Sequence, residues 1–320
     1  MRLNSTPEAC GSAVCSGFMS RLGAIAIALA LFAAACTPSD AAPATTKAPT
    51  TTVSPVTTIA PPTTTTSSTV PEATATTIAA PPENECEVRP ATAAEGYVQG
   101  CTVLGIEVLA GEEVDPSAID GLADRAYNML VLLPEYAAAI ANHPIAIRVI
   151  GTAQTINKLP EFERIYFHHP GTDWRRLGRS FAGTGTIPYA AFSEENLLCS
   201  EDDRYAGEDI FLREFAITIR RYAMETIDAA TSRAIEQAYG VAIAEGKWQN
   251  TLAEINSEQY WAEGVQSFFD ANLEDNVEDR DPISSHNHVN TRDELRTYDR
   301  SLWAIAMSVF GDTEWRPSCG

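Results

Sequence analysis

The stretch with the strongest chemical pattern contains Arg213-Glu214-Phe215-Ala216-Ile217. In the zinc-binding pattern His-Glu-x-x-His, two imidazoles one helical turn apart hold the metal, and the Glu between them activates the metal-bound water. Glu214 is kept here, but Arg213 and Ile217 stand where the two histidines would be. A guanidinium and an aliphatic side chain offer no lone pair to a metal. Glu214 is therefore expected to be a vestigial general base, and no bound metal or other cofactor is expected.

The helix that should carry this stretch spans residues 208–229. Apolar side chains recur at helical spacing along one face, which can pack against a core: Ile210, Phe211, Phe215, Ile219 and Tyr222. Arg213, Glu214 and Ile217 fall on an adjoining face. We therefore expect the acid and the two replaced positions to share one side of a largely buried helix.

The remaining segments predict a helix-rich α+β domain with a small sheet. Thr291 followed by acidic residues marks one helix start. We expect other helices at residues 117–133, 136–142, 153–163, 231–246, 257–272 and 302–310. β-Branched runs indicate strands at residues 144–151 and 187–192, and residues 164–167 are also expected to be extended.

Residues 1–36 have the composition of a bacterial export signal. Arg21 is followed by the apolar run 22–32, which is too short for a stable membrane span. Three alanines directly precede Cys36, as in a lipoprotein signal whose cysteine is lipidated. Ordinary secretion with cleavage nearby is the alternative, and Met19 can begin the signal by itself. We therefore expect the protein outside the cytoplasm, either anchored to the cell membrane by lipid or secreted.

Composition divides the rest of the chain at residue 84. Residues 37–84 are almost entirely Thr, Ala, Pro, Ser and Val, which cannot bury enough apolar surface to fold, so they are expected to form a disordered linker. Residues 85–320 are long enough for one globular domain. The chain has a net charge of −21, and only seven charged residues precede residue 85. So acidic a domain argues against nucleic acid as a partner, and a lipid anchor is the one membrane contact expected.

Four cysteines remain in the expected domain: Cys86, Cys101, Cys199 and Cys319. An even number outside the cytoplasm indicates two disulfides, for which three pairings are possible. We favour Cys86 with Cys101, closing a short loop, and Cys199 with Cys319, holding the C-terminus beside the central helix. The four cysteines are too widely spaced in sequence to suggest a zinc site.

Several segments, taken in order, share a pattern with one protein family. They are residues 194–198 (EENLL) with Tyr205 and Glu208, residues 214–219 (EFAITI), residues 260–267 (YWAEGVQS), and residues 290–295 (NTRDEL) with Tyr298 and Asp299. Together they resemble secreted zinc metallopeptidases of the gluzincin type, whose third zinc ligand is a glutamate on a later helix. The central helix resembles the motif His-Glu-Phe-Ala-His-Thr-Ile with both histidines replaced. The resemblance implies a zincin-like fold from about residue 173 onward.

Position by position, the resemblance makes Glu214 the general base and Glu263 the third ligand, with Arg213 and Ile217 at the histidine positions. One carboxylate falls short of the three protein ligands of a catalytic zinc site. Two carboxylates that converge without a metal need another cation nearby. We therefore expect the Arg213 guanidinium to turn into the vacated site and bond Glu263, with Glu214 as a possible second partner, while Ile217 fills the remaining space.

Two histidine pairs are the other candidates for chemistry: His168 with His169, and His286 with His288. A loop can bring the pairs together at a relocated zinc site, although their spacing does not match the usual ligand patterns. Each pair is alternatively an ordinary polar turn. Together with Tyr298, the C-terminal pair can instead lie beside the substrate cleft that the resemblance implies. Peptidases of this type keep a hydrogen-bond donor there that stabilises the transition state.

Three functions fit these observations. We favour a non-catalytic pseudopeptidase that holds a peptide or protein ligand in an inherited cleft, by adding a strand to an exposed sheet edge. The second function is an active metal-dependent peptidase that uses zinc with Glu214, Glu263 and the displaced histidines. The third is a structural lipoprotein of the cell envelope. Stoichiometric metal separates the second function from the other two.

Overall fold

The computed structural model describes residues 84, 86–90, 96–143, 145–174, 178–274 and 286–318. Contacts divide the chain into two units, residues 1–73 and residues 74–320, and every described residue belongs to the second. The predicted export signal and nearly all of the predicted linker therefore lie outside the described residues. No helix among the described residues is both long and apolar enough to cross a membrane.

One mixed sheet of six strands lies at the centre of the N-terminal half, in the order β1-β2-β3-β4-β6-β5. The inner strands β3, β4 and β6 run parallel, whereas β1, β2 and β5 are joined by antiparallel pairing at the two sides. The strand bounds are β1 Arg89–Pro90, β2 Gln99–Val103, β3 Ile106–Ala110, β4 Ala146–Ile150, β5 Ser180–Phe181 and β6 Tyr189–Ser193. Both outer strands are only two residues long, which limits the backbone available for pairing with another chain.

Helices make up about half of the described chain. Those of the first half are α1 Pro116–Leu130, α2 Pro134–Asn142, η1 Ile156–Lys158, η2 Pro160–Phe162, α3 Ile165–His168 and α5 Glu194–Leu197. The second half contains α6 Ile210–Ile219, the π-helical turn η3 Arg220–Met224, α7 Glu225–Ile227, α8 Ala229–Ala244, η4 Leu252–Glu254, α9 Ser257–Phe268, α10 Arg292–Tyr298 and α11 Arg300–Phe310.

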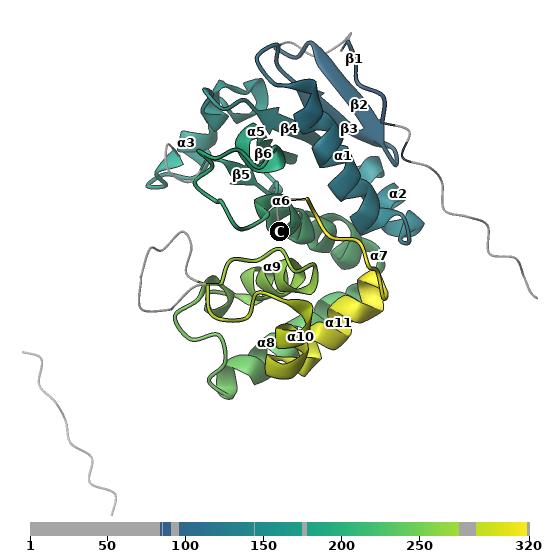
Figure 1. Ribbon diagram of the computed structural model, residues 1–320, viewed down its shortest axis with the longest axis vertical. Helices are drawn as coiled ribbons and strands as arrows, with labels where there is room; N and C mark the ends of the chain where they lie inside the picture. Colours follow the sequence, from purple (N-terminus) through teal and green to yellow (C-terminus); the bar gives the residue numbers. More distant parts are fainter. Residues whose placement is uncertain are drawn as a thin grey trace, which may run out of the picture. The chain divides into compact units, whose positions relative to one another are not determined.

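Helix α6 connects the sheet to the C-terminal helices. Phe211 and Phe215 on α6 belong to the same buried core as Phe192 of β6, and the Phe192 and Phe211 rings lie 4.5 Å apart. Helix α9 lies alongside α6, and Trp261 Nε1 of α9 donates to the Ala216 carbonyl at 3.0 Å (Figure 1). A smaller apolar cluster, which includes Phe162, packs around η1, η2 and α3. The sheet and α9 together therefore hold α6 in place.

The helix-rich α+β class and the small sheet are confirmed. Most expected helices lie close to the predicted ranges, and Thr291 forms a capping box with Glu294. The helix predicted at residues 153–163 was wrong, because Pro160 interrupts the segment and leaves two single 3-10 turns. Residues 164–167 were predicted to be extended, but residues 165–168 form the short helix α3. The hairpin β2–β3 was missed.

The predicted Cys86–Cys101 disulfide is confirmed, with the two Cα atoms 5.2 Å apart. It ties the segment before β1 to strand β2. Cys199 Sγ lies 4.0 Å from Ser318 Oγ, so the end of the described chain does reach this part of the domain. Cys319 itself lies outside the described residues, and its pairing with Cys199 stays a prediction.

A glycine in α9 tests the packing between α9 and α11. A Cβ atom on Gly264 would lie 2.3 Å from Cδ2 of the buried Leu302, whereas one on Gly240 of α8 meets nothing within 4 Å. We expect Gly264→Ala to lower the free energy of unfolding by about 1–3 kcal/mol through overpacking. Gly240→Ala should raise it by roughly 0.5–1 kcal/mol, because alanine favours a helix interior. Urea unfolding of both variants measures these changes, and an equal response would contradict the proposed packing.

Candidate functional site

The start of α6 is fixed by buried polar groups. Asp209 caps the helix by accepting from the Leu212 backbone N–H at 3.1 Å, and it also forms a buried ion pair with Arg125 at 2.5 Å. The Asn196 side chain accepts from the Ile210 N–H at 3.0 Å and donates to the Glu208 carbonyl at 2.8 Å. These contacts set the direction from which residues 208–214 enter the interior.

The acidic segment before Asn196 is structural as well. Glu194 accepts from the backbone N–H groups of Asp115 and Thr152, at 2.6 and 2.8 Å, and so joins the ends of two strands. Glu195 forms a buried ion pair with Arg179. Each side chain of Glu194-Glu195-Asn196 therefore binds a different segment and holds it beside the start of α6. These contacts explain why three polar residues stand together at this point of the sequence.

Five charged side chains converge where α6, α9 and the segment after residue 285 meet. We call them the charged cluster: Glu208, Arg213, Glu214, Glu263 and His286. Glu263 and His286 are fully buried, and Glu208 and Arg213 are 1% and 8% exposed. The Glu214 side chain is 14% exposed and is the most accessible member. The structure therefore brings the positions predicted from the motif helix and from α9 into one site.

The two oxygens of Glu263 have different environments. Oε1 lies 2.5 Å from Nδ1 of His286 and accepts a hydrogen bond from Asn272 Nδ2 at 3.0 Å. Oε2 is buried and has no hydrogen-bond partner among the described residues. Two donors thus fix the carboxylate through one oxygen and leave the other without a bond.

His286 bridges two acids. Its Nδ1 contacts Glu263, and its Nε2 lies 3.4 Å from Glu208 Oε2, which also accepts from Gln266 Nε2 at 3.0 Å. Burial alone lowers the pKa of His286, but the negative charge of Glu263, its contact with Nδ1 and the nearby Glu208 carboxylate raise it to about 10. Burial likewise raises the pKa of Glu208, yet His286 and Arg213 hold it below its ordinary value. Both ring nitrogens thus face carboxylate oxygens, and the raised pKa favours an imidazolium at neutral pH.

Arg213 bonds one of the two acids named as its expected partners. The guanidinium donates from Nη2 to Glu214 Oε1 at 3.1 Å, whereas Glu263 is contacted by His286 and not by Arg213. Burial opposes the charge of Arg213, but nearby Glu214, Glu208 and Glu263 raise its pKa further. The cationic side chains beside these acids are thus two: Arg213 contacts Glu214, and His286 contacts Glu263.

Ile217 lies in an apolar contact, as its side chain requires. It is 2% exposed and packs with Ala182 and Ala262 in a small separate cluster. Thr218, the next residue, donates to the Ala182 carbonyl at 2.8 Å, and so attaches the segment after β5 to α6. The second histidine position of the motif is therefore occupied by a side chain that seals α6 against its neighbours.

The donor set does not fit a catalytic zinc ion. Arg213 and Ile217 supply no lone pair, so of the three compared positions only Glu263 offers an oxygen, its Oε2, that has no partner among the described residues. Among the described residues, no group of three or more His, Cys, Asp and Glu side chains is arranged to hold a metal ion. A zinc site of the gluzincin type would therefore need ligands that these positions do not provide.

The other predicted histidines do not join the cluster in the described contacts. His169 packs its ring against Trp174 and Phe181 in the smaller apolar cluster, and His168 is exposed beside Phe167. His288 packs edge-on against Tyr298, at 5.5 Å between ring centroids, and the Tyr298 hydroxyl accepts from the Trp248 N–H at 2.8 Å. Of the two histidine pairs, only His286 reaches the carboxylates.

Sequence reasoning missed Glu208, Gln266 and Asn272 as members of this site. Glu208 and Gln266 lie inside segments that the family pattern covers, so their position in those segments was an available signal. Asn272 gave no such signal, because it follows the end of α9 and reaches Glu263 only through the turn there. Its contact depends on the three-dimensional path of the chain.

Comparison with known proteins adds no assignment: no protein-family model, curated protein or solved structure matches this chain. The description of the site therefore depends on its own geometry.

The imidazolium of His286 should make stability depend on pH. Because its pKa is raised, its contribution is complete below the ordinary value of about 6.5 and is lost as the pH rises through about 10. His286→Gln keeps a hydrogen-bond donor for Glu263 but cannot become charged. We expect urea unfolding from pH 6 to pH 10 to show a fall in stability that is at least about 1 kcal/mol larger in the natural chain than in this variant. An equal fall in both would contradict an imidazolium at this position.

Proposed function

We propose that this protein is a non-catalytic, zincin-like binding protein of the cell envelope. One observation carries the proposal: side chains of the protein itself, Arg213 and His286, supply the positive charge where the resemblance places a zinc ion. A peptidase site must leave its ligand oxygens and its general base available to metal and water. Here Glu263 is bonded to His286, and Glu214 is bonded to Arg213.

The contact between Arg213 and Glu214 supports a site without catalytic activity. Glu214 would have to accept a proton from water to act as a general base, but its Oε1 already accepts a hydrogen bond from the Arg213 guanidinium at 3.1 Å. Arg213 remains protonated at all physiological pH values, so this constraint is permanent. The proposal therefore assigns the domain a role in binding a peptide or protein, as a pseudopeptidase without a cofactor.

The proposed location comes from the sequence. The apolar run ending in three alanines and Cys36 supports export and attachment by lipid, with secretion as the alternative. The Cys86–Cys101 disulfide is compatible with an oxidising compartment. In this proposal the Thr- and Pro-rich residues 37–84 are a spacer between the membrane and the domain.

Zinc binding tests the proposed loss of the metal site. Arg213→His with Ile217→His places two imidazoles on the helix beside Glu263, whose Oε2 has no partner within the described part of the chain. After zinc loading and desalting, we expect about one zinc per chain in this double variant and no stoichiometric zinc in the natural protein. Ile217→His alone is the matched control and should retain none, because one imidazole and one carboxylate fall short of three ligands. Elemental analysis measures the ratio.

The same preparations test catalysis. We expect the natural protein to leave unfolded casein intact in the presence of zinc. Retention of one zinc per natural chain, together with cleavage that Glu214→Gln abolishes, would contradict the proposal and favour the metal-dependent peptidase. Failure of the folded double variant to retain zinc would instead contradict the assignment of the two histidine positions.

A further inference from the structure

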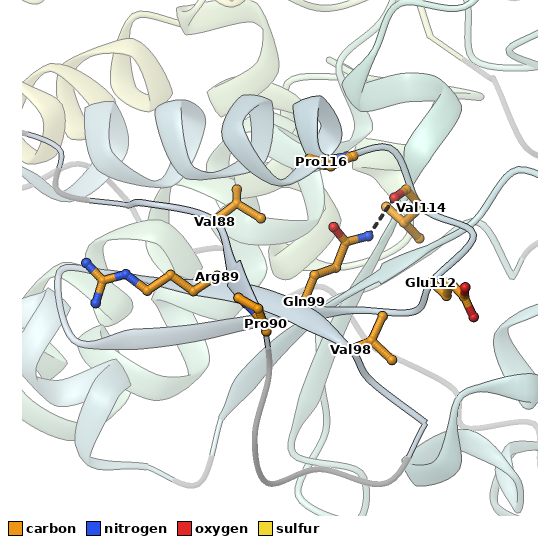
Figure 2. Close-up of a pocket in the computed structure, with 8 residues that line it drawn as sticks. All are labelled: Val88, Arg89, Pro90, Val98, Gln99, Glu112, Val114 and Pro116. Atoms are coloured by element: carbon orange, nitrogen blue, oxygen red, sulfur yellow. Dashed lines mark hydrogen bonds between the residues drawn. The ribbon is translucent and has the colours of Figure 1, made fainter.

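A groove lies at the opposite side of the sheet from β5, between β1, β2 and the start of α1. Its volume is about 390 Å³, within the range of ligand sites in proteins. Figure 2 shows its lining residues: Val88, Arg89, Pro90, Val98, Gln99, Glu112, Val114 and Pro116. Valine and proline side chains form most of the walls, and Val98 is 48% exposed. The groove thus presents apolar surface to whatever occupies it.

Local bonds make the walls rigid. The Cys86–Cys101 disulfide joins the segment that carries Val88 to β2, and antiparallel pairing places Pro90 opposite Gln99. On the other side, Asp115 caps α1 immediately before Pro116. Because these walls are already fixed, little conformational entropy would be lost when a ligand binds.

A fixed polar group lies within the apolar surface. Gln99 Nε2 donates to the carbonyls of Gly111 and Val114, at 2.9 and 2.6 Å (Figure 2 shows the second bond). These bonds orient the amide and leave Oε1 as an acceptor that has no partner among the described residues. An oriented acceptor in an apolar groove selects a ligand that offers an N–H or O–H donor.

Charge distribution narrows the class of ligand. Arg89 and Glu112 point outward near opposite ends of the groove, and the walls between them carry no charge (Figure 2). Arg89 is already paired with Glu87 at 2.5 Å. An uncharged occupant therefore matches the walls, since a buried charge would have no partner there. Peptide backbone supplies the donor for Gln99, and small apolar side chains fill the remaining space.

We propose that this groove binds an extended, uncharged peptide segment rich in small apolar residues, which donates a backbone N–H to Gln99 Oε1. Pro90 and the two-residue length of β1 disfavour recognition by strand addition, so side-chain docking and the Gln99 bond provide the contact. The site is separate from the charged cluster, and the proposal is independent of whether that cluster binds metal.

Fluorescence polarisation tests the proposal on the chain that begins at residue 37. The probe is a fluorescein-labelled, amidated peptide of sequence Thr-Val-Pro-Val-Thr-Val. We expect saturable binding that is insensitive to added salt, because the contact is uncharged. Val98→Lys should weaken binding at least about tenfold by placing a charge against the apolar walls. Val241→Lys is the matched control, since Val241 is a similarly exposed valine, 54% exposed, on α8, and it should leave the affinity unchanged.

Three results would overturn the assignment. The first is the absence of saturable binding to the natural chain. The second is an equal effect of Val98→Lys and Val241→Lys, since the groove would then not be the site. The third is a concentration-dependent dimer that Val98→Lys removes. The groove would then be a contact surface between two copies of the chain. Zinc measurements on the charged cluster have no bearing on any of these outcomes.

Discussion

The central constraint in this domain is the balance of negative charge around the buried carboxylate of Glu263. A buried carboxylate is costly unless a cation and hydrogen bonds compensate it. His286 supplies the cation and Asn272 a further hydrogen bond, while Glu208 holds the other side of the imidazole. The approach to α6, helix α9 and the segment that returns at residue 286 meet in this arrangement, since they carry Glu208, Glu263 and His286, respectively.

The three positions that the proposal compares with a metal site each satisfy their local environment. Arg213 bonds Glu214, and His286 contacts Glu263. Ile217 fills apolar space against Ala182 and Ala262. Under the proposed function, this is the pattern expected where a site has lost its chemistry and kept its fold.

Sequence reasoning predicted the features that depend on local pattern. The periodic apolar residues of α1, α6, α9 and α11, the cap at Thr291 and the β-branched strand β4 were recognisable because each is set by neighbouring residues. The β2–β3 hairpin was missed, although it runs through residues 99–110. The pairing of His286 with Glu263 joins residues 23 positions apart through a turn, and no periodic signal encodes it. Long-range ionic partners are therefore where prediction failed, as the unpredicted contact of His286 with Glu263 shows.

The protonation state of His286 in the natural protein tests the account most directly. Side-chain nitrogen NMR at pH 8 distinguishes an imidazolium, with hydrogens on both ring nitrogens, from either neutral tautomer. The account predicts that His286 is doubly protonated at this pH. A neutral His286 would contradict it, because the carboxylates of Glu208 and Glu263 would then lack the buried cation to which we assign the place of the metal.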